Sequence, residues 1–297
     1  MRLFQCCPNN SLIADGRCGW WHNPRHITAG EQTMTSASES HVLFEKRGRV
    51  GLLTLNRPEK LNAWSPEMAQ LVRDLIEQCN EDPEIGAVVI TGAGRGFCSG
   101  ADLRRDRSAE GEQQERGTRP RGSAEEPLTF MMQRSKPIIA AINGPAIGVG
   151  FTLTLCCDLR IASENARVSM RFIRIGLTPE LGSTFLLPQI AGLGNASEMI
   201  LTGRIFDAQE AQRLGVVNKV VPAEQLLETA IALGNEIAFN PRSHVRWAKR
   251  LIHSNAANDN MRSVLQAEDE IFVQAVRSPA FAEAGRAFAE KRDPQFN

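Results

Sequence analysis

The chain has 297 residues, of which 42% are hydrophobic, and it carries 34 basic and 34 acidic side chains. This length allows one large domain, or one domain with a helical appendage. The balanced charge gives no support for nucleic acid or an anionic membrane surface as a partner. No apolar run approaches the roughly 18 residues that span a bilayer.

The seven cysteines are an odd number and include two adjacent pairs, which makes a poor disulfide framework and predicts a reducing, cytoplasmic environment. Cys7, Cys18, His22 and His26 do not have the spacing of a zinc site, so we predict no metal. These four lie within residues 1–40, which show no helical or strand period and are predicted to be a poorly ordered extension.

Residues 41–222 alternate between strand-like and helix-like segments, which predicts a mostly parallel α/β core. Apolar, β-branched runs predict strands at 41–46, 50–55, 87–91, 138–142, 159–162, 168–173 and 216–221. Helical periodicity predicts helices at 66–79, from 151 onward, and at 183–190, 195–201 and 208–214. Ser65 is the predicted N-cap of the first of these helices.

From residue 223 the pattern is helical only, with helices predicted at 223–239, 242–254, 260–277 and 279–291. Residues 223–297 are therefore predicted to form a C-terminal helical subdomain. Residues 104–126 carry six arginines and six acids with almost no apolar side chain, a composition that resists burial. We expect a mobile surface segment there, which covers the ligand.

Two glycine-rich turns, 92–102 and 143–150, each follow a buried strand, and the second leads into an apolar helix. The first N–H groups of a helix have no intrahelical acceptor, and the helix dipole favours negative charge beside them. Glycines let a ligand oxygen approach such donors. The second turn is therefore a candidate site for an oxyanion or a polarised carbonyl. The alternative is a turn that only packs the helix tightly on the strand.

Two other motifs overlap the first turn. Gly96-Phe97-Cys98-Ser99-Gly100 has the form of a nucleophile elbow with Cys98 as nucleophile, but a strand does not lead directly into it and an arginine-rich stretch follows. That interpretation predicts a histidine beside Cys98. The glycines at 92, 94 and 96 do not form a dinucleotide fingerprint, because Phe97 stands where the third glycine is required.

Six segments together resemble the enoyl-CoA hydratase/isomerase (crotonase) superfamily over residues 41–294. They are NRPEKLNA at 56–63, GFCSGADL at 96–103, NGPAIGVG at 143–150, LTGR at 201–204, GVVN at 215–218 and FAEKR at 288–292. The resemblance implies an α/β crotonase (ClpP-like) fold, a spiral of ββα turns with a C-terminal helical trimerisation subdomain. It also implies a homotrimer or hexamer and an acyl-CoA thioester substrate, with coenzyme A as part of the substrate and no separate cofactor.

The resemblance also assigns roles to individual residues. The backbone N–H groups of Ala101 and Val149 would bind the thioester oxygen. Contacts to coenzyme A would come from Lys60, Asn62, Ala63, Asp102 and Leu103, and in a neighbouring subunit from Phe288 and Lys291. For Lys291, the alternative is a solvated charge at a helix end.

The chain departs from the family hydratases at the two positions where they have catalytic glutamates, since it has Thr152 and Phe172 there. Neither side chain exchanges a proton near neutral pH, so the two-glutamate hydration mechanism does not carry over. Glu180 matches the position of the single carboxylate in family enoyl-CoA isomerases. We expect apolar neighbours, Leu177 and Leu181 with Phe172, to raise the pKa of Glu180.

Glu180 has a structural alternative, because Thr178, Pro179 and Glu180 also suit the first positions of a helix. The predicted activity is the shift of an enoyl-CoA double bond, with Glu180 moving the proton. Hydration by Glu180 alone and non-catalytic acyl-CoA binding are the alternatives.

Overall fold

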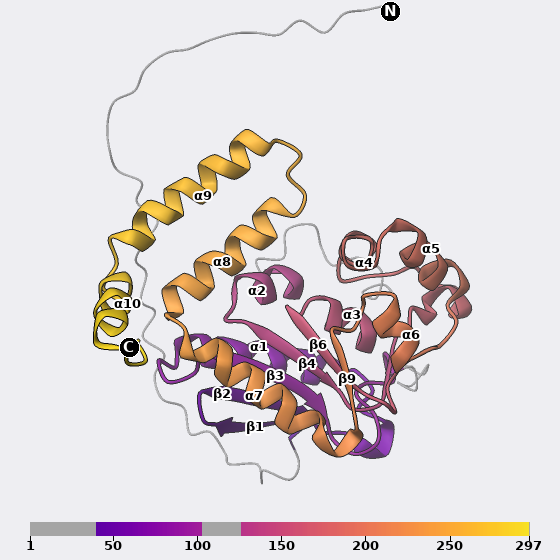
Figure 1. The fold of residues 1–297 in the computed structure, drawn as a ribbon. Coiled ribbons are helices and arrows are strands. Elements are labelled where there is room, and N and C mark those ends of the chain that lie inside the picture. The colour runs from indigo at the N-terminus through magenta and orange to yellow at the C-terminus, as the bar shows by residue number, and fades with distance from the viewer. Residues whose placement is uncertain (1–39, 103–125, 297) are drawn as a thin grey trace, which may run out of the picture. The chain divides into compact units, whose positions relative to one another are not determined.

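The computed structural model describes residues 40–102 and 126–296, which fall within one compact unit (Figure 1). The predicted N-terminal extension lies outside the described residues except for residue 40, and so does the predicted surface segment except for residue 126. Among the described helices, none is long and apolar enough to cross a membrane.

The main sheet has six strands in the order β1-β2-β3-β4-β6-β9. Their bounds are Val42–Arg47, Val50–Leu55, Ala87–Gly92, Ile138–Ile142, Leu159–Ser163 and Lys219–Val221. The first pair is an antiparallel hairpin, whose turn contains Gly48 at φ 63°, a left-handed conformation that suits glycine. All other pairs are parallel, which confirms the predicted mostly parallel core.

Both faces of this sheet are buried, as parallel sheets require. Successive residues of each strand point to opposite faces, so that Ile138 belongs to one core cluster and Ile139 to the other. Helix α7 (Leu226–Phe239) packs on the second face and contacts β2, β3, β4 and β6 (Figure 1). Helix α1 (Pro66–Glu81) supplies Met68 and Val72 to the first cluster.

The remaining elements surround this core. A second sheet has three strands, β5 (Pro145–Ile147), β7 (Arg167–Ser169) and β8 (Phe206–Asp207). Short helices of the core region are α2 (Leu128–Arg134), α3 (Val149–Leu155), α4 (Ser183–Ala191), α5 (Leu193–Thr202) and α6 (Ala208–Arg213). The chain ends with α8 (Arg242–Asn255), α9 (Met261–Val276) and α10 (Pro279–Glu290).

Most predicted elements are present with small shifts at their ends. The predicted N-cap is confirmed, because Ser65 Oγ accepts a hydrogen bond from Met68 N at 3.2 Å. The predicted strand 168–173 is wrong beyond Ser169, where a 3₁₀ helix, η2 (Arg171–Ile175), follows. Its β-branched residues favour a strand locally, but packing decides the conformation.

Several other elements also differ from prediction. Helix α3 begins at Val149 rather than 151, residues 145–147 form a strand rather than only a turn, and the last strand starts at Lys219 rather than 216. Helix α7 packs on the sheet although it follows residue 222, so the proposed boundary between core and helical subdomain stays a prediction.

Candidate active site

The two glycine-rich turns lie side by side. Cys98 and Ala146 form a parallel bridge, and Ile147 N donates to Cys98 O at 2.9 Å. The chain segments 97–101 and 145–149 therefore run in the same direction from a shared point. This contact between turns separated by almost fifty residues is what assembles the candidate site.

Ala101 and Val149 each lie three residues beyond the bridged pair. Val149 is the first residue of α3, and Gly148 before it has φ 56° and ψ −123°, which turns the chain sharply into the helix. Neither Ala101 N nor Val149 N donates to any acceptor within residues 40–102 and 126–296. Both N–H groups are thus available to a ligand, which is the property that the predicted oxyanion role requires.

The close approach of the turns depends on Gly150. A Cβ atom added there would overlap Cys98 O, Cβ and C. We expect Gly150→Ala to reduce the free energy of unfolding by about 1–3 kcal/mol, because the backbone must move apart, and to lower activity. Urea unfolding measures the first effect.

The matched control is Gly194→Ala in α5, where an added Cβ meets nothing within 4 Å. That variant should be unchanged or more stable by about 0.5–1 kcal/mol, since alanine favours a helix over glycine. Equal stability of Gly150→Ala and wild type would show that the turns need no close contact.

A buried network holds the loop 57–64 against the first turn. Asn62 is fully buried and has φ 55°. Its side chain accepts from Arg57 N at 2.7 Å and donates to Ala93 O at 2.9 Å and Gly96 O at 2.8 Å. Because the Asn62 amide is used within the protein, any contact of Asn62 with coenzyme A must come from its backbone.

Arg57 ties the same loop to the residue after Ala101. Its guanidinium donates to Asp102 Oδ2 at 2.8 Å and to Ala63 O at 2.7 Å, while Lys60 Nζ lies 3.9 Å from the same carboxylate oxygen. Four of the predicted coenzyme A residues, Lys60, Asn62, Ala63 and Asp102, are therefore close together. The role of Arg57 was not predicted from the sequence, because its partner Asp102 lies 45 positions away.

The other predicted coenzyme A residues are elsewhere. Leu103 lies outside the described residues. Phe288 lies in the last turn of α10 and Lys291 is the C-cap of this helix, and Phe288 is 89% exposed. In the single chain nothing covers this phenyl ring within the described residues.

Glu180 lies in the irregular segment before α4. The helix begins at Ser183, with Gly182 as its N-cap, so the alternative that made Glu180 part of the first helical turn is wrong. The Thr152 hydroxyl donates to Glu180 Oε1 at 3.1 Å, and its single hydrogen is shared with Val149 O at 3.2 Å. Thr152 is fully buried in α3, one helical turn after Val149, and this bond links the only predicted carboxylate to the second glycine turn.

The segment around Glu180 is also held by its main chain. Leu181 O accepts from Thr129 Oγ1 at 2.9 Å, and Leu181 has φ 53°. Glu180 and Leu177 are exposed. The apolar enclosure that was expected to raise the pKa of Glu180 is therefore not formed by the described part of the chain.

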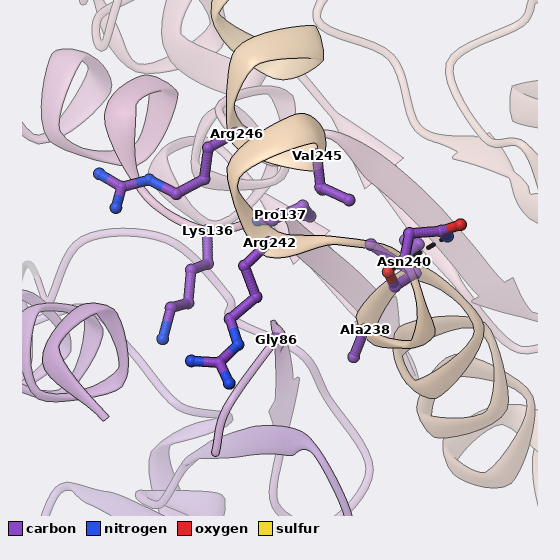
Figure 2. Close-up of a pocket in the computed structure, with 9 residues that line it drawn as sticks. Gly86, Lys136, Pro137, Ala238, Asn240, Arg242, Val245 and Arg246 are labelled. Carbon is purple, nitrogen blue, oxygen red and sulfur yellow. Dashed lines mark hydrogen bonds between the residues drawn. The ribbon is translucent and has the colours of Figure 1, made fainter. Parts of the chain in front are cut away.

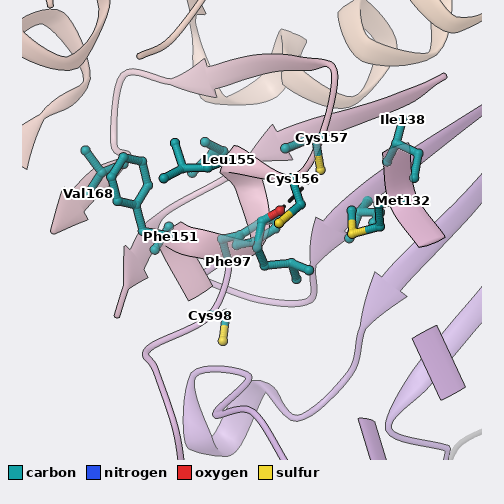
Figure 3. Packing of buried hydrophobic residues seen from close by; sticks show 14 of the residues in the cluster. Phe97, Cys98, Met132, Ile138, Phe151, Leu155, Cys156, Cys157 and Val168 are labelled. Carbon is teal, nitrogen blue, oxygen red and sulfur yellow. Dashed lines mark hydrogen bonds between the residues drawn. The ribbon is translucent and has the colours of Figure 1, made fainter. Parts of the chain in front are cut away.

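Cys98 does not suit the role of a nucleophile. It is fully buried in the main core cluster (Figure 3), and burial raises the pKa of its thiol to about 11. Such a thiol is protonated near neutral pH and is a poor nucleophile. The backbone of Cys98 contributes to the site instead, because Cys98 O accepts the hydrogen bond from Ile147 N.

The sequence profile described as enoyl-CoA hydratase/isomerase matches residues 45–297. The chain belongs to this family. A Mycobacterium bovis protein named probable enoyl-CoA hydratase is 37% identical over 280 residues, covering 91% of this chain and 96% of the relative. The 1,2-epoxyphenylacetyl-CoA isomerase of Escherichia coli K12 is 36% identical, covering 86% and 97%. A solved enoyl-CoA hydratase from Bacillus anthracis matches with TM-score 0.76 and 34% identity, covering 86% of this chain and 98% of that one.

These matches confirm the predicted superfamily and its crotonase fold, and they identify the chain as an enzyme of the enoyl-CoA hydratase/isomerase family. Relatives of similar identity are named hydratases and isomerases alike, so membership is compatible with both reactions. The contact between the Thr152 hydroxyl and Glu180 Oε1 is the part of the site that the sequence did not predict.

Proposed function

We propose that the chain binds an acyl-CoA thioester and shifts the double bond of an enoyl-CoA. The N–H groups of Ala101 and Val149 bind the thioester oxygen, which makes the C2 hydrogen acidic. The Glu180 carboxylate takes the C2 proton, and the electron pair delocalises into a dienolate. Glu180 then delivers a proton to C4, after exchange of its proton with solvent or without it, so the double bond moves with no net gain or loss of atoms.

The observation that supports this assignment is the hydrogen bond from Thr152 to Glu180 Oε1. A carboxylate that is fixed by a buried hydroxyl on α3 stays close to the helix whose first amide is that of Val149. A base has to lie within hydrogen-bonding reach of the proton it removes. With Thr152 and Phe172 at the other two positions, Glu180 is the acid–base group that this arrangement offers.

Incubation with enoyl-CoA substrates in deuterated water tests the proposal. Isomerisation moves the double bond and incorporates deuterium at C2 or C4. Hydration by Glu180 alone, which the names of several relatives favour, would give a 3-hydroxyacyl-CoA instead. Binding without either product or any exchange would identify a non-catalytic acyl-CoA binding protein and overturn the proposal.

Thr152→Val tests the contact itself. Valine keeps the volume but cannot donate to Glu180, and a hydrogen bond to a charged group contributes about 1.5–3 kcal/mol. We therefore expect the proton-exchange rate to fall by about ten- to a hundredfold, measured by deuterium incorporation, while Thr152→Ser retains most of it. Thr154→Val is the control, because Thr154 is equally buried on α3 and its hydroxyl donates only to Phe151 O. An equal loss in both variants would indicate a packing effect.

We also propose that three or six copies assemble through the C-terminal helices. Large apolar side chains are exposed along α9 and α10 in the single chain, among them Phe272, Phe281 and Phe288. Exposed apolar surface of this kind is typical of protein–protein contacts. Assembly would bring Phe288 and Lys291 to the coenzyme A of a neighbouring copy.

A further inference from the structure

A small cavity lies away from the candidate active site, where α7 ends and α8 begins (Figure 2). Its lining includes the apolar side chains of Pro137, Ile237 and Val245. The free volume is about 10 Å³, which corresponds to one water molecule or one small ion. The polar side chains of the lining indicate whether the cavity suits a water molecule or an ion.

Three cationic side chains line this cavity, Lys136, Arg242 and Arg246, and among the described lining residues none is acidic. Lys136 is only 5% exposed, and Figure 2 shows it extending alongside Arg242. Burial lowers the pKa of Lys136, and Arg242 and Arg246 lower it further. Lys136 Nζ donates to Cys79 O and Asp82 O, both at 2.6 Å, which are neutral acceptors.

One carboxylate acts on Lys136, but it is engaged with another lysine. The Asp82 carboxylate acts on Lys136 electrostatically, but its side chain forms an ion pair with Lys46 at 3.3 Å. Arg242 and Arg246 form no ion pair with any acid in the described parts of the chain. Lys46 also pairs with Glu84, and no described acid lines the cavity or pairs directly with Lys136, Arg242 or Arg246.

Arg242 also has an unused donor. Its Nε atom is buried and has no hydrogen-bond partner, the one such side-chain nitrogen or oxygen within residues 40–102 and 126–296. Buried charged donors are normally paired, because desolvation without a partner is costly. A missing acceptor at this atom points to a ligand.

The start of α8 adds to the positive electrostatic potential at the cavity. The helix begins at Arg242, and its N-cap, Pro241, provides no side-chain acceptor. The first amides of a fourteen-residue helix carry partial positive charge that attracts anions. Asn240, Arg242 and Val245 from this end of the helix line the cavity.

We propose that this cavity binds a single monatomic anion, chloride in the cell, between Arg242 Nε and Lys136. The volume excludes phosphate and other polyatomic anions. The bound ion would neutralise the like charges and join the start of α8 to Lys136, two residues before β4. This site is independent of the acyl-CoA chemistry proposed above.

Halide binding is tested by thermal unfolding in chloride and in gluconate at equal ionic strength, about 0.15 M. Ligand binding to the folded state raises the melting temperature, and we expect chloride to raise it by about 2–4 °C in the wild type. Arg242→Gln should lose this difference. Arg250→Gln, which changes an exposed arginine of α8 outside the cavity lining, should keep it.

Crystals soaked in bromide give a test that does not depend on a variant folding. Anomalous scattering should show one bromide within hydrogen-bonding distance of Arg242 Nε. Equal melting temperatures in both salts together with no bromide peak would overturn the proposal, and so would a chloride effect that Arg242→Gln retains.

Discussion

Glu180→Gln is expected to slow the exchange of substrate C2 hydrogens with solvent by about 10²–10⁴-fold, the usual contribution of a positioned acid–base group. Glutamine keeps the size of the side chain and can still accept the hydrogen bond from Thr152, so the local structure should persist. It cannot take up the C2 proton. Deuterium incorporation into an enoyl-CoA, followed by mass spectrometry, measures the effect directly.

The affinity for the acyl-CoA should not change in this variant, because the proposed coenzyme A contacts lie on the loop 57–64 and around Asp102. Calorimetric titration with a saturated acyl-CoA checks this. Glu164→Gln is the control, since Glu164 is another exposed glutamate and its backbone N, not its side chain, bonds to Val221 O. Full exchange activity in Glu180→Gln would remove Glu180 from the mechanism.

Lys249→Met is expected to lower the free energy of unfolding by about 3–5 kcal/mol, the usual cost of removing one partner of a buried ion pair. Lys249 is 6% exposed on α8, and its Nζ donates to Asp158 Oδ2 at 2.7 Å and to Met132 O at 2.8 Å. Asp158 Oδ2 also accepts from Ile138 N at 2.7 Å. Methionine fills the space but leaves the carboxylate without its cation.

Acid should reduce the difference in the free energy of unfolding between Lys249→Met and the wild type. Burial alone would raise the pKa of Asp158, but hydrogen bonds from His253 and Lys249 hold it below its usual value. A carboxyl whose pKa is lower in the folded than in the unfolded state stabilises the folded protein at pH values above the unfolded pKa, about 3.9. This stabilisation is lost as the pH falls from that value through the lower folded pKa. The two proteins should therefore begin to converge at about pH 4, where unfolded Asp158 takes up a proton, and should converge fully only below the lowered pKa of folded Asp158.

Chemical unfolding at neutral and acid pH measures this convergence. Lys219→Met, which removes an exposed lysine in β9, should leave stability almost unchanged because surface charges contribute little. A Lys249→Met variant as stable as the wild type at neutral pH would show that the buried pair contributes nothing that methionine cannot replace.

Elements with a strong, simple pattern could be predicted from the sequence. The strands at 50–55 and 138–142 have the bounds that their apolar runs predict, because burial on both faces requires a continuous apolar run. The run at 168–173 is also mostly apolar, but its first two residues lie in a strand and residues 171–173 belong to a 3₁₀ helix. Which of two conformations an apolar run takes depends on the elements it packs against, and local composition does not contain that information.

The candidate site also has parts that could be predicted from the sequence and parts that could not. The glycine-rich turns could be predicted, because steric freedom follows from residue type, whereas α3 starts at Val149 and not at the predicted residue 151. The bond between Thr152 and Glu180 was not readable, since it joins residues 28 positions apart and depends on where two elements meet. The same reason explains why the segment before α4 was mistaken for a helical turn, although its threonine, proline and glutamate favour one.

The bridge between Cys98 and Ala146 has a consequence for how such a site can vary. Both candidate amides are placed by counting three residues from that bridge, and their side chains take no part in it. Changes of side chain at these two positions alter the shape of the acyl pocket and leave the N–H groups in place. A single inserted or deleted residue on either branch would shift one amide and not the other, so divergence at this site is limited by chain length rather than by chemistry.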